Sequence, residues 1–305
     1  MVGSKNVLEQ GRDERNGKVA GTVGEAIRHI NGVELCTESF GSTGNPCVLL
    51  IMGAMASMVW WDTEFCERLA KRGLFVIRFD NRDVGRSVSY PPGEIHYSMH
   101  DLADDAVAVL DSYGIANAHF VGMSLGGMIA QVVALKYPKR ISSITAIASG
   151  VFADRPDLPP IEERILAYHS KATDVNWADE ESVRPYLVAG WKLLNGTRHP
   201  FDEEQAVALA DTEIHRARCL TSMFNHAHLK GAEELFEKVA SIRLPLLVIH
   251  GTLDPVLPYP HAVALAETIP GSKLVALEGA GHEIHKNDWN LVISEIASHI
   301  SKITK

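Results

Sequence analysis

Hydrophobic residues in this 305-residue chain form short continuous runs that alternate with stretches of helical periodicity. Runs that are apolar at successive positions predict strands buried on both faces, as in a parallel sheet. Amphipathic helices between such strands predict βαβ units. The expected strands cover residues 47–53, 74–80, 118–123, 141–149, 244–251 and 273–279, and the expected helices cover 61–73, 99–114, 125–137, 261–269 and 289–302.

An antiparallel hairpin is expected to open this sheet. Residues 25–30 and 33–40 flank Asn31-Gly32, the strongest short-range hairpin signal. The pattern therefore predicts an α/β fold with a mostly parallel sheet and helices on both faces.

One region breaks the alternation of strands and helices. Residues 151–238 contain no β-like run, are helical in pattern and carry Trp177, Trp191 and Phe201. We expect this region to be a helical insertion, placed above the carboxyl edge of the sheet, where open α/β sheets bind ligands. It would act as a cap, or lid.

The insertion divides the predicted core into two segments of the chain. The core is expected to comprise residues 25–150 and 239–305, and residues 1–24, which are charged and glycine-rich, are expected to form a flexible tail. No apolar leader segment is visible in that tail. The four cysteines are widely spaced without a C-x-x-C pair, which favours a reducing compartment. We therefore predict a cytoplasmic protein.

Charge and motif content narrow the possible partners. A formal net charge of -9 argues against nucleic acid and anionic membranes as partners. No dinucleotide or P-loop fingerprint appears, so no cofactor is predicted. His226 and His228, in "NHAH", lie two residues apart on an expected helix and so point apart, which favours a solvated face over a metal site. No metal site is predicted, and the oligomeric state cannot be read from the sequence.

A serine between glycines is the main candidate for chemistry. Gly122-Met123-Ser124-Leu125-Gly126 joins an expected buried strand to an expected helix, the context of a nucleophile elbow. The tight turn lifts the hydroxyl clear of the sheet, and the glycines remove Cβ atoms that would clash. The alternative is an ordinary helix N-cap serine in a glycine-rich turn.

A nucleophilic serine needs a base and an acid to orient that base, expected in the chain order Ser, Asp or Glu, His. Asp254 follows one late strand and His282 follows the next. The alternatives are an Asp-Pro turn former and an exposed loop histidine. Weaker rivals flank His282 at Glu278, Glu283 and His285. Asp80 and Arg82 also follow a strand, where they are expected to brace the turn.

An oxyanion hole needs two backbone N–H groups aimed where negative charge develops. One is expected from Leu125, directly after the serine. The other is expected from the loop after the strand at 47–53, at Ala54 or nearby.

These motifs resemble the α/β-hydrolase superfamily. The similarity covers about residues 25–300 and rests on the elbow together with "IMGAMAS", "FDNRDVGRS", "HGTLDPVLP" and "GAGHEI". Within the superfamily the chain looks most like capped bacterial esterases related to aclacinomycin methylesterase, and it is similar to cofactor-free haloperoxidases and enol-lactonases. Many relatives carry His-Gly at the oxyanion loop, where this chain has Met52-Gly53. A backbone donor survives that change.

The resemblance implies an eight-stranded sheet with a helical lid after strand six. It implies that Ser124 is the nucleophile, Asp254 the acid and His282 the base. A serine at the elbow argues against dehalogenases and epoxide hydrolases, which the family builds on aspartate.

The expected function is a serine esterase acting on small carboxylic esters through an acyl-enzyme. A lactonase, a C–C hydrolase or a cofactor-free perhydrolase on the same triad remains open, as does a small-molecule receptor on the same fold. Met55, Met123, Trp177 and Trp191 are candidates to line the substrate pocket. The alternative for these side chains is packing in the core and the lid.

Overall fold

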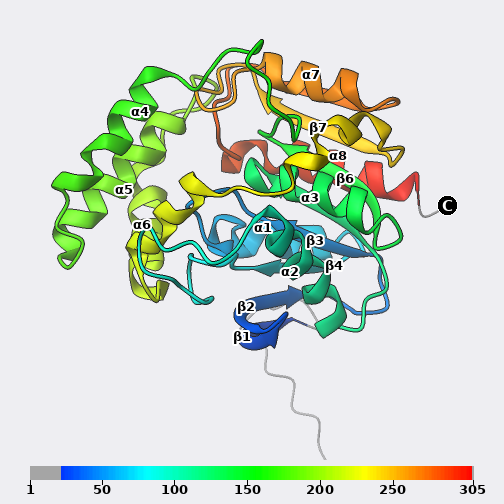
Figure 1. Cartoon of the computed structure of the whole chain (residues 1–305), viewed down its shortest axis with the longest axis horizontal. Coiled ribbons are helices and arrows are strands. Elements are labelled where there is room, and N and C mark those ends of the chain that lie inside the picture. Colours follow the sequence, from blue (N-terminus) through cyan, green and yellow to red (C-terminus); the bar gives the residue numbers. More distant parts are fainter. Residues whose placement is uncertain (1–21, 304–305) are drawn as a thin grey trace, which may run out of the picture.

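The computed structural model describes residues 22–303. Within that range the strands form a single eight-stranded sheet in the order β1-β2-β4-β3-β5-β6-β7-β8, and every pairing from β4 through β8 is parallel (Figure 1). The strands are β1 (Val23–Ile30), β2 (Val33–Phe40), β3 (Cys47–Ile51), β4 (Phe75–Phe79), β5 (Ala118–Met123), β6 (Ile141–Ile147), β7 (Leu246–Gly251) and β8 (Lys273–Leu277).

The antiparallel hairpin that opens the sheet is confirmed. β1 pairs with β2 across Asn31 and Gly32, whose φ angles are 50° and 78°. Positive φ at both central positions is the geometry of a type I′ turn, which matches the twist of the flanking strands. β1 begins at Val23, so it includes the last two residues of the predicted tail, 1–24. Residues 1–21 of that tail lie outside the described residues.

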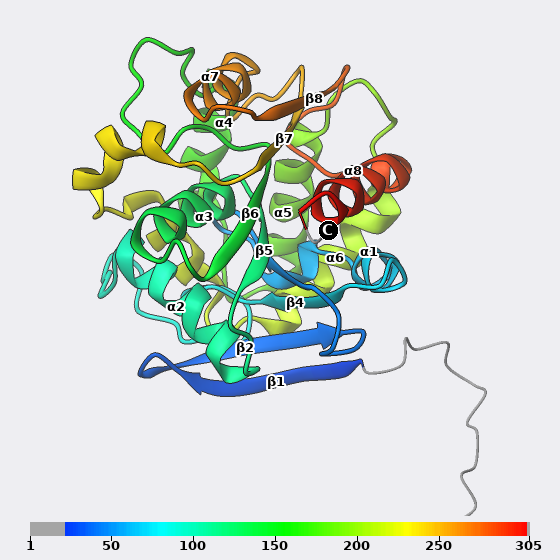
Figure 2. The same ribbon diagram turned by 90° about the vertical axis from the view of Figure 1, so that its right-hand side faces the viewer.

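Helices cover both faces of the sheet, as predicted. Figure 2 shows α2 and α3 on one side and α1 and α8 on the other. Successive side chains of a strand accordingly point to opposite faces: in β3, Leu49 and Ile51 join one hydrophobic cluster, while Val48 and Leu50 join the opposite one. The helices outside the insertion are α1 (Thr63–Ala70), α2 (Met99–Ser112), α3 (Leu125–Lys136), α7 (Pro260–Thr268) and α8 (Trp289–Ser301).

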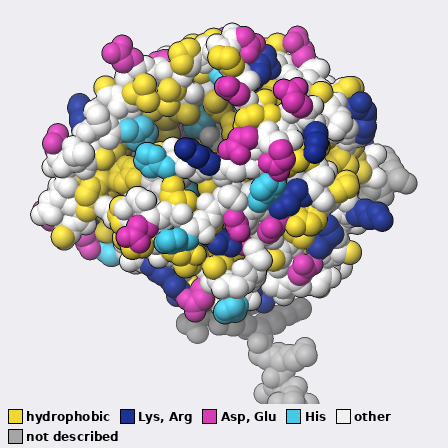
Figure 3. All heavy atoms as spheres, in the orientation of Figure 1, with side chains coloured by type: hydrophobic (Ala, Val, Ile, Leu, Met, Phe, Trp, Pro, Cys, Tyr) yellow, Lys and Arg dark blue, Asp and Glu magenta, His cyan; other side chains and the backbone are white. Residues whose placement is uncertain are grey.

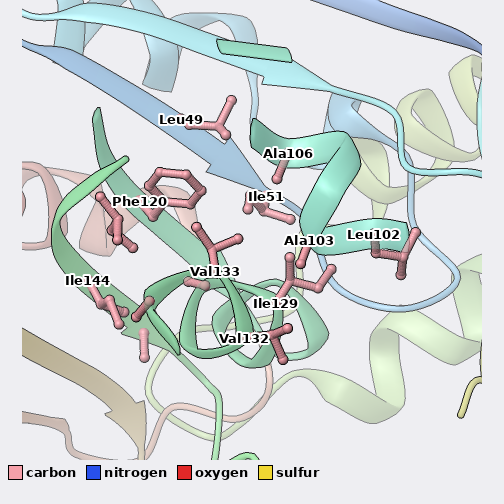
Figure 4. Close-up of a cluster of buried hydrophobic side chains, with 14 of the residues drawn as sticks. Leu49, Ile51, Leu102, Ala103, Ala106, Phe120, Ile129, Val132, Val133 and Ile144 are labelled. Atoms are coloured by element: carbon pink, nitrogen blue, oxygen red, sulfur yellow. The ribbon is translucent and has the colours of Figure 1, made fainter. Parts of the chain in front are cut away.

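The packing around α3 fixes the start of that helix. Figure 4 shows side chains from α2, α3, β3, β5 and β6 converging in one cluster. Phe120 of β5, Ile129 of α3 and Leu102 of α2 are all fully buried there. Because α3 is enclosed by the sheet and by α2, its first residue is held rigidly at the carboxyl end of β5.

A helical segment lies between β6 and β7, as the pattern predicts. It contains α4 (Glu163–Ser170), α5 (Glu180–Leu194), α6 (Glu203–Arg216) and the 3-10 helices η2 (Lys171–Asp174), η3 (Leu220–His228) and η4 (Glu233–Ser241). We call residues 151–238 the inserted segment. α4, α5 and α6 lie together beside the sheet (Figure 1).

The inserted segment packs in two ways. Side chains of α5 and α6 form a small hydrophobic cluster that includes Val183, Leu187 and Ala210. Val151, at one end of the segment, and Leu235 of η4, at the other, instead join the main core. Both ends of the segment therefore pack with the core while its middle forms a separate cluster, and the predicted division into core and cap stays a prediction.

Element ends differ from the expected ones where local caps intervene. The helix expected over 61–73 begins at Thr63, because the carboxylate of Asp62 accepts the N–H of Glu64 at 2.7 Å and caps it. Residues Met58–Trp60 form the short 3-10 helix η1 just before it. Within residues 22–303 no helix is both long and apolar enough to cross a membrane.

Candidate active site

Ser124 occupies a strained turn between β5 and α3. Its φ is 50° and its ψ is -118°, a positive φ that is uncommon for a residue with a side chain. The backbone is anchored on both sides: the N–H of Ser124 donates to the carbonyl of Ile147 at 2.9 Å, and the hydroxyl of Ser149 donates to the carbonyl of Ser124 at 2.7 Å.

The glycines around Ser124 are needed for close packing. A Cβ at Gly122 would lie 2.2 Å from the carbonyl of Gly126, and a Cβ at Gly126 would lie 2.1 Å from the carbonyl oxygen of Ile51. A Cβ at Gly127 would lie 2.5 Å from the Ser149 hydroxyl. Helix α3 thus approaches β3 and β5 too closely for any side chain at these positions.

The Ser124 hydroxyl is not used to cap the helix. No side-chain capping bond forms at the start of α3, and the hydroxyl makes no hydrogen bond to any other residue in the described range. The side chain is partly exposed at the N-terminus of α3. The N-cap alternative is therefore excluded by this geometry.

Asp254 and His282 form a buried pair. Asp254 lies in the loop after β7 and His282 in the loop after β8, and His282 Nδ1 lies 2.6 Å from Asp254 Oδ2. The other oxygen, Oδ1, accepts the N–H groups of Val256 and Leu257, both at 2.8 Å. In the tautomer that donates from Nδ1 to this carboxylate, Nε2 is the atom that can accept a proton.

His250 is a second histidine on the same carboxylate, and the sequence reasoning missed it. Its Nε2 lies 3.2 Å from Asp254 Oδ2 and 2.7 Å from the carbonyl of Leu257. Burial disfavours the charged form of Asp254, but the nearby charge of His282 and the hydrogen bonds from His250 and His282 outweigh it and lower the pKa of Asp254. The available signal was a histidine at the strand end, four residues before the acid.

Ser124 and His282 lie at the same edge of the sheet. Ser124 follows β5 and His282 follows β8, and the carboxyl ends of these parallel strands point the same way. No hydrogen bond joins the two side chains in the part of the chain described. In unliganded enzymes such contacts are often long and tighten only when substrate binds. The serine–histidine partnership stays a prediction.

The two expected oxyanion donors are uncommitted. The N–H groups of Leu125 and Ala54 donate to no other residue between positions 22 and 303. The loop after β3 passes beside the nucleophile, since a Cβ at Gly53 would lie 3.1 Å from the Cβ of Ser124. Both groups are thus available near Ser124.

Comparison with known proteins identifies the family. The α/β hydrolase fold family matches residues 46–184, and a TAP-like protein family matches residues 214–299. Over 293 residues the chain is 36% identical to rhodomycin D methylesterase DauP of Streptomyces sp. (strain C5), covering 89% of this chain and 96% of the relative. The chain is an α/β hydrolase. The resemblance stated from its motifs is confirmed.

Further similarities agree with that family. The hydrolase is 34% identical over 293 residues to rhodomycin D methylesterase DnrP of Streptomyces peucetius, covering 89% of this chain and 96% of the relative. Its fold matches the crystal structure of an enol-lactonase from Burkholderia xenovorans LB400 with a TM-score of 0.72 at 21% identity, covering 90% and 100% of the two chains.

A cavity of about 510 Å³ lies between the inserted segment and the core of the hydrolase. Met123 and Glu283, the neighbours of Ser124 and His282, line it, although Ser124 and His282 do not. Trp191 also lines it and packs edge-on against Trp60, with ring centroids 4.8 Å apart. The structure therefore places Met123 and Trp191 at a cavity beside the candidate catalytic residues.

The other two predicted pocket residues lie elsewhere. Trp177 lines none of the cavities described for residues 22–303; it packs against Tyr186 and Phe224, and its indole N–H donates to the carbonyl of Ala172. This is packing within the inserted segment, so we leave Trp177 out of the proposed pocket. Met55 lines a smaller cavity of about 30 Å³ that Trp191 shares.

The expectation of a solvated face at "NHAH" is wrong for His226. Its side chain is only 6% exposed, whereas His228 is exposed as predicted. The His226 ring lies between two core loops: Nδ1 accepts the N–H of Met55 at 3.0 Å, and Nε2 donates to the carbonyl of Arg82 at 2.7 Å. The sequence pattern could not reveal these contacts, because they join residues more than a hundred positions apart.

The turn after β4 is braced as expected. Arg82 forms two hydrogen bonds to the buried carboxylate of Asp105, at 2.6 and 2.8 Å. Asp80 accepts the N–H groups of Met58 and Arg86, both at 2.8 Å.

On the face shown in Figure 3, acidic and basic side chains are interspersed.

Proposed function

We propose that this chain is a serine hydrolase that cleaves carboxylic esters through an acyl-enzyme on Ser124. The observation that carries the proposal is the uncommitted Ser124 hydroxyl, held on a strained turn at the N-terminus of α3. The Asp254–His282 pair at the same sheet edge supplies the base and its orienting acid. The rhodomycin D methylesterases support an ester as the substrate.

The reaction follows from these groups. Ser124 Oγ attacks the ester carbonyl carbon while His282 Nε2 takes the hydroxyl proton, and the N–H groups of Leu125 and Ala54 stabilise the oxyanion. His282 then returns the proton to the departing alcohol, leaving an acyl-serine. Water, deprotonated by His282, then attacks the acyl carbonyl carbon, and His282 returns that proton to Ser124 Oγ as the bond to the serine breaks and the carboxylic acid departs. Asp254 stabilises the imidazolium that forms at each step.

The substrate we propose is a methyl ester with a bulky, aromatic acid part. A methanol leaving group needs little room, whereas the cavity of about 510 Å³ is large enough for several rings. Trp60, Trp191 and Trp289 line it, and flat aromatic surfaces favour flat ligands.

A cytoplasmic location, predicted from cysteine usage, belongs to the same proposal. Cys36, Cys47, Cys66 and Cys219 are all free thiols. Burial raises the pKa of Cys36, Cys47 and Cys66 to about 12, so these thiols stay protonated and unreactive.

The test is turnover of a panel of aromatic methyl esters, p-nitrophenyl esters and lactones by the wild type and Ser124→Ala. We expect the wild type to hydrolyse the methyl esters, and Ser124→Ala to lose roughly a million-fold in kcat, as loss of a triad nucleophile does elsewhere. A wild type that turns over only lactones would replace the esterase by a lactonase. Binding of the panel without any turnover would favour a receptor, and full activity in Ser124→Ala would exclude Ser124 as nucleophile.

A further inference from the structure

The loop after β3 carries the expected second oxyanion donor, and side chains of the inserted segment form hydrogen bonds to this loop. We call residues 52–57 the oxyanion loop. We propose that His226, from the inserted segment, is a positioning residue for the oxyanion hole: it holds the backbone at Met55 so that the N–H of Ala54 faces the reacting carbonyl. This inference rests on the proposed function.

The first observation is the double contact of the His226 ring. Its Nδ1 accepts from Met55 N–H at 3.0 Å and its Nε2 donates to the carbonyl of Arg82 at 2.7 Å. Only the neutral tautomer with a proton on Nε2 satisfies both contacts. Burial, which disfavours the charged ring, lowers the pKa of His226 and keeps it in that form.

The second observation is strain at the residue that His226 holds. Met55 has a φ of 64°, in the left-handed region that favours glycine. For a residue with a side chain this conformation is strained, so it needs support from its surroundings. The hydrogen bond from Met55 N–H to His226 supplies that support directly.

Covalent geometry links this contact to the oxyanion hole. The N–H of Met55 belongs to the planar peptide between Ala54 and Met55. That plane shares the Cα of Ala54 with the peptide that carries the Ala54 N–H, so turning one plane disturbs the other. Gly53, at the start of this stretch, lies against Ser124, with a built Cβ only 3.1 Å from the serine Cβ.

A second side chain from the inserted segment holds the far end of the loop. Glu213 of α6 accepts the N–H of Ser57 at 3.0 Å and its hydroxyl at 2.9 Å, and the carboxylate is buried. Asp80 of the core accepts the next N–H, from Met58, at 2.8 Å. The loop is therefore fixed at Met55 and Ser57 by the inserted segment, which makes the segment part of the catalytic framework as well as a cover.

Filling this space alone would not require a histidine. An apolar side chain would occupy the same space but would leave the Met55 N–H and the Arg82 carbonyl without these hydrogen bonds. The imidazole adds one acceptor for Met55 N–H and one donor for the Arg82 carbonyl. Of these, the acceptor acts on the oxyanion loop.

The test compares variants that keep one contact each. Asparagine places its Oδ1 near the position of Nδ1, so His226→Asn retains the acceptor for Met55; glutamine places its Nε2 near the ring Nε2, so His226→Gln retains the donor to Arg82. His226→Leu removes both, and His228→Asn is the exposed control. Active sites are counted by fluorophosphonate labelling, so that only folded enzyme enters kcat.

We expect His226→Leu to lose about 10- to 100-fold in kcat, less than the 10²–10³ typical of deleting an oxyanion donor outright. KM should change by less than about two-fold, because ground-state binding is untouched. Affinity for a trifluoromethyl ketone, whose adduct carries an oxyanion, should fall by a factor similar to that in kcat. His226→Asn should retain more kcat than His226→Gln, and His228→Asn should match the wild type.

The inference is overturned if His226→Leu keeps wild-type kcat per labelled site, or if only KM changes. If His226→Leu does not label, kcat of His226→Asn is compared with kcat of His226→Gln. Equal kcat in these two variants, or a higher kcat in His226→Gln, overturns the inference. Failure of the proposed function looks different, because the wild type itself would then not label at Ser124.

Discussion

At the scale of single residues, Asp254 carries the most hydrogen bonds at the site. Two backbone N–H groups fix its Oδ1, and His282 and His250 both approach Oδ2. In Asp254→Asn an amide NH₂ would face the Nδ1–H of His282, donor against donor. The ring would then adopt the other tautomer and lose its basic Nε2. We expect kcat to fall about 10⁴-fold while KM stays within a few-fold.

A matched control exists for this substitution. Asp288 is also buried and paired with a histidine, His199 at 2.9 Å, and within residues 22–303 it forms no hydrogen bond to Ser124, Asp254 or His282. Asp288→Asn should lower stability but leave kcat per labelled site unchanged. Equal losses of kcat in the two variants would mean that Asp254 acts only through folding.

The positions of Ser124, Asp254 and His282 could be predicted because each lies at the end of a hydrophobic run, while their catalytic roles stay a prediction. Chain order and strand position were enough to bring them to one edge. His250 could not be assigned in the same way, since its role depends on which face of β7 it occupies. The pattern of a strand that is buried on both faces does not distinguish its two sides.

At the scale of elements, the contacts between α6 and the oxyanion loop make stability depend on pH. Burial raises the pKa of Glu213 to about 7, and the nearby charge of Asp80 adds to the rise, against the Ser57 hydrogen bonds that lower it. The ordinary pKa of a glutamate is 4.5, so between pH 4.5 and 7 the folded state holds a proton that the unfolded state has lost. Stability from this group therefore falls as pH rises through that window.

Glu213→Gln keeps an oxygen to accept from Ser57 and removes the charge. We expect it to be more stable than the wild type at pH 8, by up to about 3 kcal/mol, with the difference shrinking towards pH 4.5. Urea unfolding at pH 5 and pH 8 measures this change. Exposed Glu204→Gln, on the same helix, should leave both unfolding curves nearly unchanged. If Glu213→Gln is more stable than the wild type by the same amount at both pH values, titration of Glu213 is not the cause of the difference.

The hydrophobic pattern predicted the sequence of strands and helices because each element buries a continuous or periodic set of side chains. It did less well at element ends, where single capping side chains decide, as Asp62 does for α1. It failed at His226, because a side chain that reaches into another segment leaves no periodic trace. Pairings of that kind depend on the tertiary structure alone.

At the scale of the whole molecule, the inserted segment and the core enclose the proposed substrate cavity. Trp191 lines this cavity, whereas Trp177 packs inside the segment. Trp191→Ala should change KM and the order of preference among bulky esters by about ten-fold or more, with little loss of stability. Trp177→Ala should leave KM and the order of preference nearly unchanged, but it should lower the free energy of unfolding by up to about 3–5 kcal/mol.

Kinetics across the ester panel and urea unfolding of both variants separate these effects. If Trp191→Ala keeps wild-type selectivity, the cavity beside Met123 is not the acid-binding site.

The central claim is that Ser124 carries the acyl group. The most direct test mixes the enzyme with an aromatic ester, quenches in acid within the first turnover, and maps the added mass by peptide mass spectrometry. We expect one acyl group on Ser124, absent after Ser124→Ala and trapped longer in His282→Ala if acylation still proceeds there. An acyl group on any other residue, or ester turnover with no acyl adduct at any quench time, would contradict it.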